Sequence, residues 1–260
     1  MLGETFLSIP FLPDGNVTLM LVDGRINKAM EYNLKQKGIR IIKTQPLPQL
    51  LPAIAYHPDM MLHPIEGNTV VVAPDISPDV VAQLKDEGFN ILYGKAALCG
   101  NYPKDIAYNI ARIGNNAMHN FKYTDSMTHE LLQQQKLKFI DVKQGYTKCS
   151  VLVVDPNSIV TEDIGIAKVA AKNGINVLLI ERGHVSLPGM NYGFIGGSGG
   201  LISKSVMAFA GDVSTHPDYN KIKNFLNERE IEIYNLDNGY IWDLGSLIPL
   251  KQCKWNKTVV

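Results

Sequence analysis

Short apolar runs alternate with stretches of mixed apolar and polar residues along most of the chain. The clearest example begins with Ser150–Asp155, SVLVVD, whose apolar run predicts a buried strand. Thr161 is then expected to cap a helix that has acidic residues in its first turn, and Gly174 is expected to end it. Ile175–Ile180, INVLLI, predicts a second strand. This order of strand, helix, glycine and strand is typical of an α/β unit.

Four further copies of this order are found along the sequence. Their first strands are expected at residues 18–23, 69–74, 106–113 and 205–212, and their second strands at residues 39–43, 89–93, 138–142 and 232–236. Between copies lies another short segment, such as residues 52–64, PAIAYHPDMMLHP, which predicts an additional short strand in each unit. Five units in 260 residues give about 50 residues each, within the range of known repeat architectures.

The additional strand decides between two architectures. A doubly wound parallel sheet also alternates strands and helices, but it has no place for another short strand in each unit. We therefore predict an α/β fold in which five ββαβ units surround a central axis as a propeller. No linker rich in Pro, Gly or Ser divides the chain, so residues 1–250 are predicted to form a single closed domain and residues 251–260 a C-terminal tail.

Charge and hydropathy exclude several classes of partner. Lys plus Arg equals Asp plus Glu at 25 each, so the chain lacks the positive field of a nucleic-acid binder or a membrane anchor. Its longest apolar runs are too short to cross a bilayer, and residues 1–10 lack the pattern of a signal peptide. We expect a cytoplasmic protein that binds a small-molecule ligand and uses no cofactor. The oligomeric state stays open.

The three cysteines are Cys99, Cys149 and Cys253, an odd number spaced too widely for a disulfide framework or a paired-cysteine zinc site. Reduced thiols are therefore expected. Cys149 is the strongest candidate for reactivity, because Lys143 and Lys148 lie close to it in the sequence and could lower its pKa.

Four segments carry a resemblance to a known fold: YHPDMMLHP, VKQGYTKCSVLVVD, GFIGGSGG and FAGDVSTHPDY. Together with the five-unit plan, they make the chain similar to the pentein superfamily, the guanidino-group-modifying enzymes. That superfamily includes arginine and agmatine deiminases, amidinotransferases and dimethylarginine hydrolases. The resemblance covers nearly the whole chain and also suggests kinship with an uncharacterised bacterial family of this fold.

Enzymes of the pentein superfamily hold a guanidinium with carboxylates, attack its central carbon with a cysteine thiolate and transfer protons with a histidine. At related places in the repeat this sequence has Asp59, Asp105, Cys149 and Asp243, with His57 two residues before Asp59. We infer Cys149, His57 and Asp59 as catalytic residues. The resemblance implies that Asp105 and Asp243 bind the substrate cation.

The sequence also departs from the superfamily pattern. In the deiminases a Gly-rich segment leads into a His-Cys pair in the last unit, whereas Ile202 and Ser203 stand in the corresponding places here. The usual nucleophile is thus missing, and Cys149 as its replacement is inferred from its position in this sequence. The alternative is that Cys149 is a small buried hydrophobe, as cysteines beside strands commonly are.

The segment around His57 allows a second interpretation. If it is extended, His57, Asp59 and His63 lie on one face, where they could bind a metal or transfer a proton. Pro58 and Pro64 interrupt the segment, however, and favour a structural role for His63. No metal site is therefore predicted.

The run Gly193–Gly200, GFIGGSGG, contains too many glycines for an ordinary strand or helix. Its backbone amides, at Gly197 and Ser198 for example, could hold an anion, and the same run could instead form a tight corner. No Lys-Ser or Lys-Thr ending makes it a nucleotide-binding loop.

Five further residues are candidates for substrate binding. Lys143, Gln144 and Tyr146 form a polar loop before Cys149, and specificity often resides in such loops. Asp212 and His216 lie where a helix is expected to begin, and there capping is the more ordinary role.

Three hypotheses of function follow from these residues. The first is a hydrolase or transferase that acts on a guanidino, amidine or related compound through a cysteine thiolate. The second is a noncatalytic small-molecule binding or interaction protein that retains the same fold. The third is a metal-dependent hydrolase that uses His57, Asp59 and His63.

Overall fold

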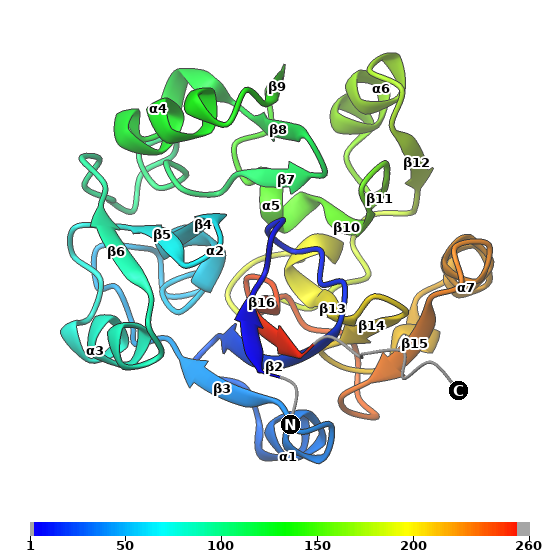
Figure 1. The fold of residues 1–260 in the computed structure, drawn as a ribbon. Helices are drawn as coiled ribbons and strands as arrows, with labels where there is room; N and C mark the ends of the chain where they lie inside the picture. Colours follow the sequence, from blue (N-terminus) through cyan, green and yellow to red (C-terminus); the bar gives the residue numbers. More distant parts are fainter. Residues whose placement is uncertain (1–2, 254–260) are drawn as a thin grey trace, which may run out of the picture.

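The computed structural model describes residues 3–253, which form five small β-sheets around a common centre (Figure 1). The four-stranded sheet consists of β1 (Glu4–Phe6), β16 (Ile248–Cys253), β2 (Asn16–Val22) and β3 (Arg40–Lys43), in that order. The three-stranded sheets are β4 (Leu62–Glu66), β5 (Thr69–Val72) and β6 (Asn90–Tyr93); β7 (Ala111–Ile113), β8 (Asn116–His119) and β9 (Lys138–Asp141); β10 (Leu152–Asp155), β11 (Ser158–Thr161) and β12 (Asn176–Leu179); and β13 (Gly199–Ser203), β14 (Val206–Phe209) and β15 (Glu232–Asn235).

All four three-stranded sheets have the same connectivity. The first strand pairs antiparallel with the second, and the second pairs parallel with the third after a crossover helix. Their crossover helices are α3 (Pro78–Asp86), α4 (Ser126–Gln134), α6 (Ile164–Lys172) and α7 (Tyr219–Asn227), and α1 (Lys28–Gln36) connects the parallel strands β2 and β3 of the four-stranded sheet in the same way. All five helices lie at the periphery in Figure 1. The additional strand predicted for each unit is therefore present in these sheets.

Helix boundaries mostly follow the local signals in the sequence. Before α3, the side chain of Ser77 accepts a hydrogen bond from a first-turn amide, Pro78 occupies the first position, and Gly88 follows the helix with a φ of 85°. In α6 the predicted cap is wrong. Asp163 caps this helix, because Thr161 is the last residue of β11.

Two strands of the structure, β8 and β11, were not predicted in the third and fourth units. The predicted first strands of these units, residues 106–113 and 150–155, contain β7 and β10. Each of these strands is followed by a tight turn and then by β8 or β11, which are only four residues long. β8, NAMH, begins and ends with polar residues, and Thr161 at the end of β11 was assigned to a helix cap, so neither segment was recognised as an apolar run.

The last strand of the described chain belongs to the first sheet. β16 pairs antiparallel with both β1 and β2. Its pairing with β2 corresponds to the antiparallel pairing of β4 with β5 in the second unit. The predicted start of the tail is therefore corrected: Lys251–Cys253 lie within β16, and residues 254–260 lie outside the described residues. None of the sheets of residues 3–253 closes on itself, and a closed propeller stays a prediction.

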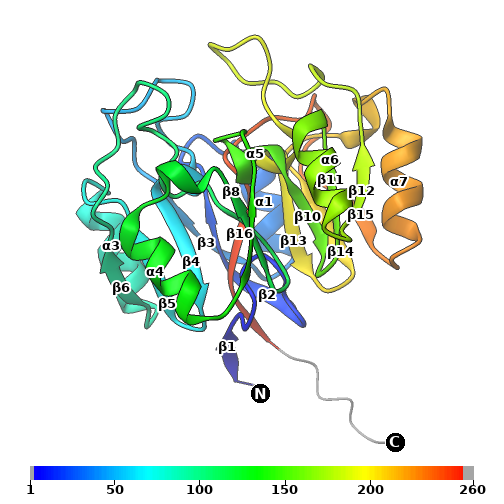
Figure 2. The same cartoon turned by 90° about the horizontal axis from the view of Figure 1, so that it is seen from above.

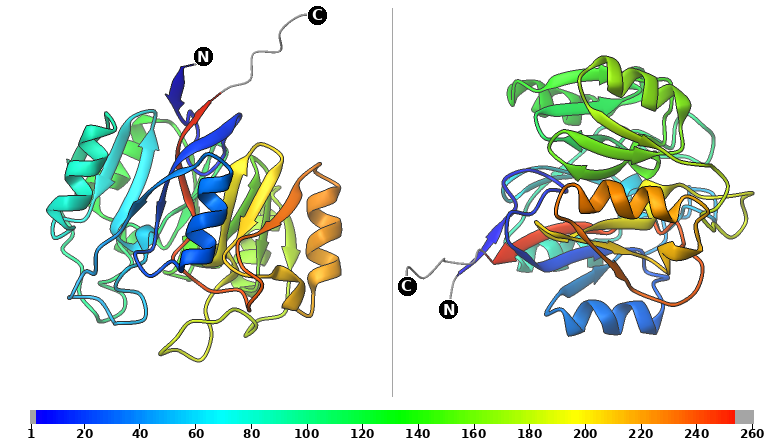
Figure 3. Two further views of the ribbon diagram at one scale, coloured as in Figure 1. Left: turned by 90° about the horizontal axis from the view of Figure 1, so that it is seen from below. Right: turned by 90° about the vertical axis from the view of Figure 1, so that its right-hand side faces the viewer.

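The two ends of the molecule differ. β1 and the end of β16 project from one end, whereas α5 (Thr147–Ser150) and several long loops gather at the other (Figures 2 and 3). Two short 3₁₀ segments, η1 (Phe121–Tyr123) and η3 (Val213–Thr215), belong to the connections. No helix within residues 3–253 is long and apolar enough to cross a membrane.

Candidate active site

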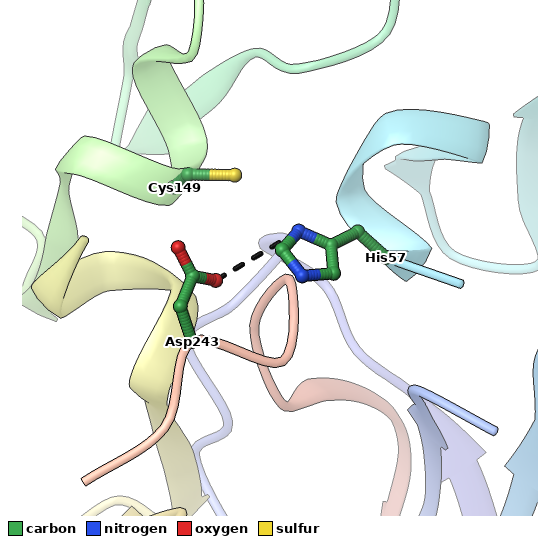
Figure 4. Close-up of side chains that lie close together, drawn as sticks. All are labelled: His57, Cys149 and Asp243. Carbon is green, nitrogen blue, oxygen red and sulfur yellow. Dashed lines mark ion pairs between the residues drawn. The ribbon is translucent and has the colours of Figure 1, made fainter. Parts of the chain in front are cut away.

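Three short helical turns meet near the centre, each directly before the first strand of a unit. They are α2 (Pro58–Met61) before β4, α5 before β10, and η2 (Ile195–Ser198) before β13. His57 lies at the start of α2 and Cys149 on α5, while Asp243 lies on the loop that leads to β16. Figure 4 shows these three side chains facing one another.

The thiol of Cys149 is buried and is held by two neighbouring side chains. Its Sγ lies 3.1 and 3.3 Å from the two carboxylate oxygens of Asp59, to which it donates, and 3.3 Å from Nδ2 of Asn109, from which it accepts. Oδ1 of Asn109 also accepts the backbone amides of Lys148 and Cys149 at 2.7 and 3.2 Å. These contacts fix the position of α5 relative to α2.

Lys148 places a buried positive charge behind Cys149. Its Nζ donates to Oγ of Ser246 at 2.8 Å and to the carbonyl of Gly196 at 3.2 Å. Oγ of Ser246 in turn lies 2.7 Å from Oδ2 of Asp59. Burial lowers the pKa of Lys148, whereas the nearby carboxylates favour its charged form.

His57 and Asp243 form the other side of the site. Nδ1 of His57 lies 3.8 Å from Oδ1 of Asp243, and neither ring nitrogen has a hydrogen-bond partner among the described residues. Complete burial lowers the pKa of His57, so the imidazole is neutral at neutral pH. Asp243 accepts the amides of Gly245 and Phe194 at 3.0 and 2.9 Å, and burial raises its pKa to about 6.

The structure corrects the expected ionisation of Cys149. Burial is the largest effect and raises the pKa of the thiol well above its usual range, and the charges of Asp59 and Asp243 raise it further. Lys143, expected from the sequence to lower this pKa, is exposed on the loop. The thiol is therefore protonated at neutral pH in the ligand-free protein.

A cavity of about 250 Å³ opens onto these groups. It is lined by Leu51, Ala53, Ile54, His57, Tyr146, Cys149, Leu187, Met190, Asn191, Tyr192, Phe194 and Asp243. Asp59 is not part of the lining. It lies behind the lining residue Cys149, whose thiol it contacts. The cavity thus has a closed polar end with a thiol, an imidazole and a carboxylate, and walls that are largely apolar.

Several glycines allow the close approaches that build this end. A Cβ atom on Gly197 would collide with the carboxylate of Asp243. A Cβ atom on Gly193 would collide with the Cβ atom of Asp243. Gly245 has a φ of 61°, and a Cβ atom there would collide with His57. The Gly-rich run is thus a close-packed turn followed by β13, which accounts for its composition without a bound anion.

The structure brings together several of the residues selected from the sequence. Cys149, His57, Asp59 and Asp243 form one cluster. Tyr146 lines the cavity, and its hydroxyl donates to Oδ2 of Asp105 at 2.5 Å. Burial raises the pKa of Asp105, which lies behind this tyrosine rather than in the cavity wall.

Other selected residues lie outside the cavity wall. Ser198 is buried, and its hydroxyl donates to the carbonyl of Ile195. Gln144 donates to Asp163 and lines a neighbouring pocket. Asp212 caps η3, and Nδ1 of His216 accepts the amide of Asp218.

The metal-binding face that an extended segment would have formed is not present. Pro58–Met61 is helical, so the alternation expected for an extended segment fails, and His63 lies on β4. Within residues 3–253 the group whose ligand atoms lie close enough to hold a metal is His57, Cys149 and Asp243, all within 4.8 Å of one another.

Four residues that shape the site had weak or no signals in the sequence. Lys148, on α5, and Asn109, on the loop before β7, are buried polar residues that were not selected as site residues. Ser246 precedes β16 and carries the contact between Lys148 and Asp59. Glu162, expected in a helix cap, accepts the amide of Ile195, and burial raises its pKa to about 8.

Comparisons with known proteins agree with this fold. The model of a family of unknown function, DUF6873, matches residues 21–248. No curated protein matches the chain in sequence.

Solved structures of similar fold are enzymes that modify guanidino groups. SxtG, an amidinotransferase of saxitoxin biosynthesis from Microseira wollei, is 10% identical, with a TM-score of 0.56 over 97% of this chain and 98% of that one. The agmatine deiminase of C. jejuni is 12% identical, with a TM-score of 0.56 over 98% and 97%. The inosamine-phosphate amidinotransferase StrB1 from Streptomyces griseus is 9% identical, with a TM-score of 0.52 over 97% and 98%. The predicted relation to the pentein fold is confirmed.

Proposed function

The chain belongs to DUF6873, a family of unknown function, and from its site we propose that it is a hydrolase or transferase acting on a guanidino or amidino compound through the thiol of Cys149. One observation carries this proposal. The Cys149 thiol contacts the carboxylate of Asp59 at 3.1 Å and lies within 4.8 Å of His57 and Asp243, at the closed end of a cavity. The fold of the similar enzymes supports the same class of reaction.

The charges at the closed end favour a ligand with one positive charge. Two acids, Asp59 and Asp243, lie beside a single amine, Lys148, and burial raises the pKa of both acids and lowers the pKa of the amine. Buried charge is costly unless it is paired, so one added cation would balance the cluster. A flat guanidinium also presents several N–H donors to a carboxylate such as Asp243.

The bound cation would also activate the thiol. The two carboxylates raise the pKa of Cys149, and a positive charge bound in the cavity beside Asp243 and the sulfur would act in the opposite direction. The thiolate is the nucleophilic form. We therefore expect Cys149 to ionise when substrate binds, and to stay protonated in the empty site.

The reaction can be written with atoms and charge balanced. Sγ of Cys149 forms a bond to the central carbon of the guanidinium, one C–N bond breaks, and the thiol proton leaves on the departing ammonia or amine. Water then adds to the same carbon and the C–S bond breaks, which returns the thiol and releases a urea and one proton. An amine in place of water would make the protein an amidinotransferase.

His57 is placed to carry protons in both steps. Its imidazole is neutral and buried, lines the cavity, and has no hydrogen bond to any described residue that would restrict it. It can accept a proton from the attacking water and return it to the leaving group.

The test combines turnover and binding. Wild-type protein is incubated with alkylguanidines and amidines, ammonia and urea products are measured, and binding is followed by thermal stabilisation. Cys149→Ser should bind the same compounds and form no product, whereas Asp243→Asn should lose binding by tenfold or more. Stabilisation of the wild type without product would instead support a noncatalytic binding protein, and no binding of any cation would contradict the proposal.

A zinc site is the second candidate. His57, Cys149 and Asp243 supply the nitrogen, sulfur and oxygen ligands that zinc accepts, and three protein ligands are typical of a catalytic zinc. Such a protein would bind one zinc ion per chain in calorimetry, and Cys149→Ala would abolish binding. No uptake of zinc at micromolar concentration would remove this candidate.

We also propose that the five units form a closed propeller. The pairing of β16 with β1 and β2 supports this arrangement, because it joins the end of the chain to the first sheet.

A further inference from the structure

The walls of the cavity differ sharply from its closed end. Leu51, Ile54, Leu187, Met190 and Phe194 belong to its lining, and none of these side chains carries a charge. Leu51 and Met190 are 42% and 52% exposed, so they form the rim. At about 250 Å³, the cavity fits a small ligand, since typical pockets for larger ligands span roughly 300–1,000 Å³.

No lysine or arginine belongs to the described lining of the cavity. Arg25, on a neighbouring loop, pairs with Asp23 at 2.6 Å and donates to the carbonyl of Pro52. The ammonium of Lys148 is buried behind Cys149 and is engaged by Ser246. A carboxylate on the far end of a ligand would therefore meet no positive partner among the lining residues.

The same reasoning applies to a second positive charge. Asp243 is the one carboxylate of the described lining, and it lies at the closed end. A distal ammonium group on a ligand would lie against the apolar wall, without an acidic partner there.

We propose that the ligand of this site is a monocationic guanidine or amidine with an uncharged, apolar tail. This inference rests on the proposed function, because it assumes that the cation is held at Asp243. It excludes free amino acids such as arginine, which carry a carboxylate, and diamine derivatives such as agmatine, which carry a second ammonium group. Burial of an unpaired charge gives this discrimination, and apolar contact with the wall gives affinity for the tail.

The inference is tested by calorimetric titration of Cys149→Ser, which keeps a hydroxyl in place of the thiol and separates binding from turnover. The probes are n-butylguanidine, phenylguanidine, agmatine, arginine and n-butylurea. We expect both apolar guanidines to bind at least tenfold more tightly than arginine and agmatine. Butylurea has nearly the same shape and no charge, and it should bind at least tenfold more weakly than butylguanidine.

A pair of variants tests the part played by the wall. Met190→Lys adds a cation at the rim and should strengthen arginine binding at least threefold relative to butylguanidine. Tyr32→Lys adds the same charge on α1, at a residue that is 61% exposed and outside the lining, and it should leave the ratio unchanged.

The outcomes separate the two claims. If arginine or agmatine binds as tightly as butylguanidine, the inference about the tail is overturned while the proposed function stands. If Met190→Lys leaves the affinity for arginine relative to butylguanidine unchanged, the inference about the tail is overturned as well. If none of the guanidinium compounds binds, the proposed function itself fails.

Discussion

At the scale of single residues, the thiol of Cys149 lies between groups that act on it in opposite directions. Burial and the carboxylates of Asp59 and Asp243 raise its pKa, whereas the hydrogen bond from Asn109 lowers it. Burial is the largest of these effects. The ligand-free thiol is therefore expected to react slowly, although it lines a cavity.

The first prediction concerns the pH dependence of this reactivity. Alkylation of Cys149 by iodoacetamide, followed by peptide mass spectrometry, should increase only above about pH 9, because the thiolate reacts and the ordinary cysteine pKa is about 8.5. Asp59→Asn removes one negative charge from beside the sulfur and should increase the rate at pH 8 by tenfold or more. Cys99, alkylated in the same sample, is the internal control for the reagent. A Cys149 midpoint at or below pH 8.5 would contradict the environment described here.

Glu162 is a second buried acid, and its ionisation is linked to stability. Burial raises its pKa to about 8, although the amide of Ile195 donates to its carboxylate. The folded protein therefore binds a proton more tightly than the unfolded chain, whose glutamate pKa is about 4.3. This contribution to stability is present at low pH and is lost as the pH rises toward 8.

The second prediction follows from this loss of stability with rising pH. Glu162→Gln removes the group that ionises, so the variant should not lose this stability as the pH rises. Its free energy of unfolding should exceed that of the wild type by on the order of 3 kcal/mol at pH 8, and by less at pH 5. Urea unfolding between pH 5 and pH 8.5 measures the difference. Glu130→Gln, on the exposed face of α4, is the matched control and should leave the pH dependence unchanged. A variant that is less stable than the wild type at pH 8 would show that the carboxylate is needed as an ion.

At the scale of elements, the site is built by turns placed directly before strands. α2 and α5 carry Asp59 and Cys149, and η2 lets the chain pass close to Asp243. Pro58 at the first position of α2 explains why this segment is helical and not extended. The same local geometry that separates His63 from His57 brings Asp59 against the thiol.

The third prediction tests the close approach of η2 to Asp243. Gly197→Ala places a Cβ atom against the Asp243 carboxylate, so the side chain must move and the affinity for butylguanidine should fall at least tenfold. Gly239→Ala, where no atom lies within 4 Å of the added Cβ atom, should bind as the wild type does. Calorimetry measures the affinity, and a cooperative unfolding transition shows that each variant is folded. Unchanged affinity in Gly197→Ala would mean that this packing does not position Asp243.

At the scale of the whole molecule, the two ends of the described chain are joined in one sheet. β16 pairs with β1 and β2, and the side chain of Gln252 extends the connection. Its Oε1 accepts the amides of Asp14 and Gly15 at 2.8 and 3.0 Å, and the residue is buried.

The fourth prediction concerns this connection. Gln252→Ala leaves two amides without that acceptor and should lower the free energy of unfolding by about 1–3 kcal/mol. Thr5→Ala removes an exposed hydroxyl that donates to the Gln252 carbonyl at 3.4 Å, and it should cost less than about 0.5 kcal/mol. Urea unfolding of both variants provides the comparison. Equal small effects would show that the side chain of Gln252 contributes little to joining the ends.

Much of the fold follows from local pattern. Ser77, Pro78 and Gly88 mark the ends of α3 through capping and backbone preference, which depend on near neighbours in the chain. Thr161 failed as a cap because it pairs in β11, and the four-residue strands β8 and β11 were missed because tertiary pairing defines them more than their own composition does.

By itself, the sequence determined the α/β class, the repeated strand–helix–strand order and a candidate set that contained Cys149, His57, Asp59 and Asp243 together with Asp105. These depend on residue types and on spacing in the repeat. Only the tertiary structure decided that Asn109 contacts the thiol, that Ser246 joins Lys148 to Asp59, and that Asp212 and His216 lie outside the cavity wall. It also decided the protonation of Cys149, because burial and the distances between charges arise from segments far apart in the sequence.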